Sequence, residues 1–93
     1  MNVLIIEDDR RLADALVRLM QRQKYIAEAV YNWRDGLEYA RLNPYNVVVL
    51  DVGLPDLSGL EIARTLRREK NATPILMLSA RSTVADRVKG LDS

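Results

Sequence analysis

The chain contains 93 residues, of which 48% are hydrophobic and 29% are charged, and its formal net charge is +1. These values indicate one globular domain with a single hydrophobic core, and they give no bulk positive field to attract nucleic acid. The sequence has no cysteine and no histidine, which excludes disulfides, thiol chemistry and the usual zinc sites. It also lacks a membrane-spanning apolar run and a signal peptide. We therefore expect a cytoplasmic domain without membrane contact.

The pattern of apolar residues predicts four strands that alternate with four helices. In chain order, the expected elements are a strand over 2–6, a helix over 10–23, a strand over 25–30, a helix that follows Asn32 and ends before 43–45, a strand over 47–50, a helix over 58–70, a strand over 73–79 and a helix over 82–91. Asp9 and Asn32 stand where helix N-caps belong. The alternation argues for one α/β domain over residues 1–93, a parallel sheet with helices on both faces.

The apolar residues also predict where each element lies in the domain. The run 47–50 is the most continuously apolar strand, so we expect it near the centre of the sheet. The run 25–30 alternates apolar and polar residues, as is typical of a partly buried strand. Leu12, Leu16 and Leu19 form an apolar stripe on the first helix.

Acidic residues follow two of these strands. Glu7 and Asp8 come directly after Ile6, and Asp51 comes directly after Leu50. In a doubly wound sheet of order 2-1-3-4, the first and third strands are neighbours, and a crevice opens at their carboxyl ends. Neighbouring strands lie about 4.8 Å apart. We therefore expect Glu7, Asp8 and Asp51 in one pocket, where their charges raise one another's pKa unless a cation intervenes.

The composition of this pocket indicates its chemistry. An oxygen-only ligand set suits a hard, hydrated cation; Mg²⁺ is the first choice, before Ca²⁺ or Mn²⁺. Beside such an ion, Asp51 could act as a nucleophile toward a phosphoryl group and form an acyl phosphate. The main-chain carbonyl of Gly53 could add a metal ligand, and the Ser79 hydroxyl, at the end of the fourth strand, could bind a phosphoryl oxygen.

Several of these residues also have a purely structural explanation. Asp9 fits a helix cap far better than a metal ligand. Asp8 alone could be a cap or a surface acid, and a serine at a strand end, such as Ser79, is usually a loop residue. Asp51 is harder to explain by folding, because it follows four buried residues. The convergence of the two acidic strand ends is therefore the basis of the site prediction.

Longer stretches of the sequence resemble the receiver domain of two-component response regulators, particularly those of the transcription-factor type. VLIIEDD is similar to the first strand and acidic pocket of that family, and VVVLDVGLPDLSGLEIARTLR is similar to its phosphoacceptor strand, loop and third helix. TPILMLSAR and DRVKGLDS resemble its fourth strand and fourth helix. The pattern D-x-x-L-P-x-x-x-G from Asp51 to Gly59 is specific to the family.

The resemblance implies a flavodoxin-like, doubly wound parallel sheet of order 2-1-3-4 and a phosphoacceptor signalling domain rather than an enzyme. Asp51 would be the phosphorylated residue. Asp8, Asp51 and the Gly53 carbonyl would bind Mg²⁺ directly, Glu7 would act through water, and Ser79 would contact the phosphoryl group. The phosphoryl donor would be a phosphohistidine on a sensor histidine kinase or a small acyl phosphate, and the output of the parent protein would be transcription.

The family's fifth strand, fifth helix, catalytic lysine and DNA-binding domain would all follow Ser93, so the resemblance implies a receiver domain truncated before its fifth strand. An open fourth strand and the uncovered stripe of Leu12, Leu16 and Leu19 then predict self-association, as a dimer or by exchange of elements. Without the lysine we expect weaker Mg²⁺ binding or slower phosphorylation. We expect no direct binding of nucleic acid by this chain.

Three other functions stay open. A magnesium-dependent phosphohydrolase usually needs a second acid two residues after its aspartyl nucleophile, where this chain has Gly53. A nucleotide- or flavin-binding domain needs glycines after the first strand to cradle phosphate, where this chain has EDDRR. A non-switching interaction or decoy module, which keeps the receiver surface but is not phosphorylated, is the main alternative to a phosphoacceptor.

Overall fold

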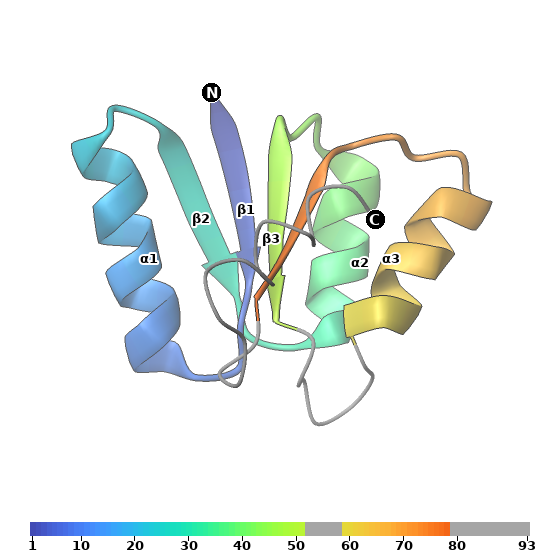
Figure 1. Ribbon diagram of the computed structural model, residues 1–93, viewed down its shortest axis with the longest axis horizontal. Helices are drawn as coiled ribbons and strands as arrows, with labels where there is room; N and C mark the ends of the chain where they lie inside the picture. The colour runs from blue at the N-terminus through green and yellow to red at the C-terminus, as the bar shows by residue number, and fades with distance from the viewer. Residues whose placement is uncertain (52–58, 79–93) are drawn as a thin grey trace.

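A computed structural model of the chain describes residues 1–51 and 59–78 (Figure 1). Its elements are β1 (Asn2–Ile6), α1 (Arg10–Arg22), β2 (Ile26–Val30), α2 (Trp33–Leu42), β3 (Val47–Asp51), α3 (Gly59–Arg68) and β4 (Ile75–Leu78). Every element predicted within the described residues is present, with ends that differ from the prediction by no more than two residues. The helix predicted over 82–91 lies outside the described residues.

The four strands form one parallel sheet in the order β2-β1-β3-β4, which confirms the predicted topology. β1 lies between β2 and β3, and its last residue, Ile6, pairs with Val30 on one side and with Leu50 on the other. The carboxyl ends of β1 and β3 therefore finish side by side. This register places the residues that follow Ile6 and Leu50 at the same edge of the sheet.

Side chains that alternate along the strands build two cores, one on each face of the sheet. On one face, Leu4, Ile6 and Leu50 pack with α2 and α3. On the other face, Ile5 and Val49 pack with residues of α1. Figure 1 shows the same arrangement, with α2 and α3 together and α1 apart from them. Helices cover both faces, as the sequence predicts.

The two predicted caps start the helices that flank the sheet. Asp9 Oδ1 accepts hydrogen bonds from the backbone N–H groups of Arg11 (3.0 Å) and Leu12 (3.2 Å) at the start of α1. Asn32 Oδ1 accepts one from the Asp35 N–H (2.8 Å) at the start of α2. Each cap satisfies N–H groups that have no partner inside the helix. Asp9 is thus a cap, and the chain turns into α1 immediately after the acidic residues.

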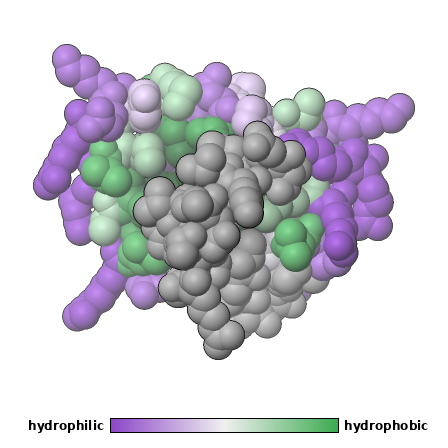
Figure 2. Space-filling model, viewed as in Figure 1, coloured by the Kyte–Doolittle hydropathy of each residue, from purple (hydrophilic) through white to green (hydrophobic). Residues whose placement is uncertain are grey.

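The apolar stripe of α1 is only partly covered. Leu16 packs against the sheet, whereas Leu12 and Leu19 are 44% and 47% exposed. Figure 2 shows apolar side chains at the surface over α1, beside the hydrophilic residues of the outer flank. The uncovered part of the predicted stripe therefore consists of Leu12 and Leu19. No helix in the described part of the chain is long and apolar enough to cross a membrane.

Candidate metal centre

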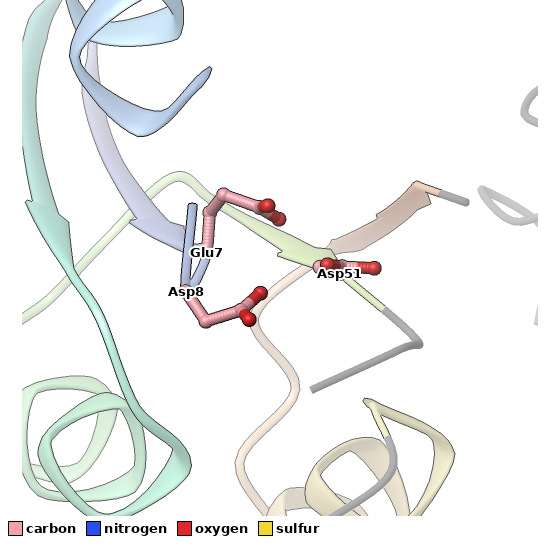
Figure 3. A group of neighbouring side chains, drawn as sticks. All are labelled: Glu7, Asp8 and Asp51. Carbon is pink, nitrogen blue, oxygen red and sulfur yellow. The ribbon is translucent and has the colours of Figure 1, made fainter. Parts of the chain in front are cut away.

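Three carboxylates meet at the carboxyl ends of β1 and β3. Glu7, Asp8 and Asp51 each contribute an oxygen atom, and these oxygens all lie within 4.8 Å of one another. In Figure 3, Glu7 and Asp8 extend from the end of β1 on the side of the sheet where Asp51 ends β3. The predicted proximity of the three carboxylates is therefore confirmed.

The backbone around Glu7 fixes the position of this cluster. The Glu7 N–H donates to the Val30 carbonyl (3.1 Å), which extends the pairing of β1 with β2 by one residue. The Asp9 N–H donates to Glu7 Oε1 (3.4 Å), a long hydrogen bond across the turn that leads into α1. The Glu7 side chain is therefore held between a strand that is paired on both sides and the capped start of a helix.

The three carboxylates differ in their exposure to solvent. Glu7 is only 4% exposed, Asp51 is partly buried, and Asp8 is exposed. Burial, together with a hydrogen bond to Asp51 and the negative charge of that residue, raises the pKa of the Glu7 carboxyl from 4.5 to about 7. The charge of Asp8 adds to this rise, and the hydrogen bond from the Asp9 backbone opposes it. At neutral pH, Glu7 therefore holds a proton in part of the molecules, as expected for crowded acids without a cation.

The donor set fits a divalent cation such as Mg²⁺. All the donors are carboxylate oxygens, which hard cations prefer. The oxygens converge from two adjacent strands. Glu7 is buried and can be held firmly, whereas Asp8 and Asp51 are less buried and remain reachable from solvent. A cation at this point would remove the repulsion that raises the pKa of Glu7.

The structure brings together three of the five predicted site residues. The other two, Gly53 and Ser79, lie outside the described residues, so their predicted roles as a carbonyl ligand and a phosphoryl contact stay predictions. The three that are described are contributed by two strands that are neighbours in space but far apart in the sequence. Their proximity depends on the strand order.

The same edge of the sheet carries contacts that were not predicted from the sequence. The Arg10 guanidinium lies 4.1 Å from the centroid of the Tyr31 ring, and the Tyr31 hydroxyl donates to Asp14 Oδ1 (3.3 Å). Tyr31 directly follows β2, so these contacts tie the end of β2 to the first turns of α1. The signal in the sequence is the i, i+4 spacing of Arg10 and Asp14, which places both on one face of the helix.

Known proteins are similar to this chain in both sequence and fold. A family model described as "Response regulator receiver domain" matches residues 3–93. The transcriptional regulatory protein HprR of Escherichia coli (strain K12) is 41% identical over 93 residues, which are 100% of this chain and 41% of HprR. The chain thus spans about 40% of the length of the curated relatives it matches.

Two solved structures of a response regulator named TrrA are also similar to this chain. TrrA from Thermotoga maritima in complex with Mg²⁺–BeF is 28% identical, with a TM-score of 0.82 over 87% of this chain and 70% of that one. The complex of the histidine kinase ThkA with TrrA contains a matching chain, also 28% identical with a TM-score of 0.82, over 89% of this chain and 72% of that one.

Proposed function

Because the chain belongs to the response regulator receiver domain family, we propose that it is the phosphoacceptor module of a two-component phosphorelay and that Asp51 is the residue that receives the phosphoryl group. A sensor histidine kinase donates this group in a reaction that requires Mg²⁺, and the parent protein converts the modification into an output, namely transcription. The observation that carries the proposal is the convergence of Glu7, Asp8 and Asp51 within 4.8 Å.

In this proposal, Asp8, Asp51 and the Gly53 carbonyl would bind Mg²⁺ directly, and Glu7 would contribute through water. When bound, the ion would neutralise negative charge on the transferring oxygens. An Asp51 carboxylate oxygen forms a bond to phosphorus while the bond from phosphorus to the donor's histidine nitrogen breaks. The electron pair of that bond stays on the imidazole, and the Ser79 hydroxyl donates a hydrogen bond to a phosphoryl oxygen. With a small acyl phosphate as donor, a carboxylate is the leaving group instead.

The partners in this proposal follow from proteins that are similar to the chain. The response regulator TrrA has been solved with the histidine kinase ThkA and with Mg²⁺–BeF, and HprR is a transcriptional regulatory protein. We propose that the protein of which this chain is part likewise has a kinase partner, requires Mg²⁺ and controls transcription. The chain itself acts in the cytoplasm and has no direct contact with nucleic acid.

Self-association is a further part of the proposal. Leu12 and Leu19 leave large apolar side chains exposed on α1, and β4 lies at one edge of the described sheet. Exposed leucines and unpaired strand edges both favour contact with a second copy. Size-exclusion chromatography with light scattering should give the mass of a dimer or a larger oligomer. A compact monomer at all concentrations would contradict this part.

The central test is phosphorylation of the purified chain. Incubation with acetyl phosphate and Mg²⁺ should add one phosphoryl group, detected by intact mass, and beryllium fluoride with Mg²⁺ should shift the amide NMR signals of Asp8 and Asp51. Asp51→Asn should abolish both effects. Glu38→Gln, which changes the net charge by the same amount at an exposed position of α2, should abolish neither. An unmodified wild-type protein without a Mg²⁺-dependent shift would refute the proposal and favour the decoy module.

A further inference from the structure

Helix α2 approaches the end of β1 most closely at Gly36. A Cβ atom built at this position would lie 2.5 Å from Ile6 Cδ1 and 3.0 Å from both Ile6 Cγ1 and Cγ2. Real Cβ atoms essentially never come closer than 3.0 Å to such a neighbour. Any side chain at residue 36 therefore requires that Ile6 or the helix move.

Ile6 has little room to yield. Its side chain is fully buried and belongs to the core that α2 and α3 share with the sheet. Its backbone pairs with Val30 on one side and with Leu50 on the other. Because interiors are packed nearly to the density of crystals, a rotation of Ile6 would displace other core residues. The contact with Gly36 is therefore transmitted to the backbone at the end of β1.

The next residue along that backbone is Glu7, the buried member of the carboxylate cluster. Glu7 continues the pairing of β1 through its N–H bond to Val30 and takes a second bond from the Asp9 N–H. A displacement at Ile6 therefore moves the residue whose carboxylate lies beside Asp51. Helix α2, which contributes Gly36 to this contact, also begins near the carboxylate centre, because it follows β2 directly at the same edge of the sheet.

We infer that Gly36 is a positioning residue for the carboxylate centre: its missing side chain lets α2 pack beside Ile6 without displacing it, so that the end of β1 keeps Glu7 beside Asp51. The inference rests on the proposed function, because it assumes that these carboxylates bind Mg²⁺. Loss of the hydrogen-bonded outer contacts that orient metal ligands typically lowers metal affinity about 10- to 100-fold, and we expect a displaced Glu7 to have an effect at the lower end of that range. Gly36 acts through Ile6 and would not itself be a ligand of the ion.

The test is a pair of substitutions that insert and then remove the clash. Gly36→Ala should weaken Mg²⁺ binding about tenfold, measured by NMR titration of the Asp8 and Asp51 amides under conditions where the variant is folded. Ile6→Val, which removes the Cδ1 atom nearest to residue 36, should leave Mg²⁺ affinity unchanged. The double variant should return the affinity to within about twofold of the wild type, because the closest overlap is gone.

A control separates positioning from plain loss of stability. Ala40→Gly lies on the same helix, is also buried, and lowers helix stability without any new contact to Ile6. It should lower the urea midpoint and leave Mg²⁺ affinity unchanged. Native Mg²⁺ affinity in folded Gly36→Ala, or an equal loss of affinity in Ala40→Gly, would overturn the inference.

A metal-free measurement distinguishes failure of this inference from failure of the proposed function. In EDTA, Gly36→Ala should shift the Glu7 amide signal and speed the hydrogen exchange of the N–H that donates to Val30, and Ile6→Val in the same chain should reverse both. If the wild type binds no Mg²⁺, the proposed function is wrong, and the metal-free comparison still decides whether Gly36 positions Glu7. Unchanged Glu7 and Asp51 amides in Gly36→Ala would overturn the inference directly.

Discussion

Replacing Glu7 with glutamine should stabilise the metal-free protein at alkaline pH and not at acidic pH. Glu7 is 4% exposed and is hydrogen-bonded to Asp51, and its pKa rises from 4.5 to about 7. Glutamine keeps the shape and can donate an N–H to Asp51, but it cannot ionise. Glu7→Gln therefore removes the cost of a buried negative charge without opening a cavity.

The magnitude follows from the difference between the folded and unfolded pKa values of Glu7. That difference is 7 minus 4.5, or about 2.5, and one pKa unit corresponds to about 1.36 kcal/mol, so the largest effect on the free energy of unfolding is about 3 kcal/mol. Because the folded pKa is the higher one, the proton stabilises the folded state fully below pH 4.5. This stabilisation is lost as the pH rises from about 4.5 through about 7.

The assay is urea unfolding in EDTA at several pH values between about 4.5 and 8, followed by the fluorescence of Trp33, the single tryptophan of the chain. The two proteins should have similar stability at the acidic end, and Glu7→Gln should be more stable by up to about 3 kcal/mol above pH 7. Glu38→Gln, at an exposed position, should show no such pH dependence. A difference between wild type and Glu7→Gln that is constant across this range would refute the reasoning.

Three further predictions concern the centre, a cap and the core. Mg²⁺ at about 100 times its dissociation constant should raise the free energy of unfolding by about 2.7 kcal/mol at pH 8, and Asp8→Asn should lose most of this gain in a urea titration. Asn32→Ala, which removes the cap of α2, should cost about 1 kcal/mol by chemical unfolding, whereas Asn32→Asp should cost little; equal costs would show that the cap contributes nothing. Ile62→Ala, at a fully buried position of α3, should cost about 2–5 kcal/mol, and a cost below 1 kcal/mol would contradict the described packing.

The order of elements could be predicted because it depends on local signals, whereas the position of the acidic cluster also required the strand order 2-1-3-4, which the resemblance to the receiver family implied. The apolar run before Asp51 predicts a buried central strand, and Val48 and Leu50 are indeed fully buried. Asp9 and Asn32 are recognisable caps because their side chains bond to N–H groups two or three residues away. Once two strands of a parallel sheet are neighbours, the acids that follow them must share one edge.

Other features depend on packing between distant residues and could not be read from the sequence. The strong burial of Glu7 beside the exposed Asp8 depends on which way each side chain leaves the end of β1. The close approach of Gly36 to Ile6 depends on how deeply α2 sits on the sheet. Leu16 packs against the sheet whereas Leu12 and Leu19 are largely exposed, although all three lie on the same stripe, because burial depends on how the helix sits on the sheet.

The parallel register of β1 and β3 has a consequence for errors in folding. Ile6 faces Leu50 across the ladder, and a slip of one residue along either strand would turn that strand's side chains to the opposite face. Such a slip would move the acids that follow β1 by about 3.3 Å relative to Asp51 and so disturb the arrangement of oxygens that one ion would need. An ion that binds only the correctly aligned strands stabilises that register and does not stabilise pairings in a shifted register. Mg²⁺ bound as proposed would then also favour the correct register of β1 with β3 during folding.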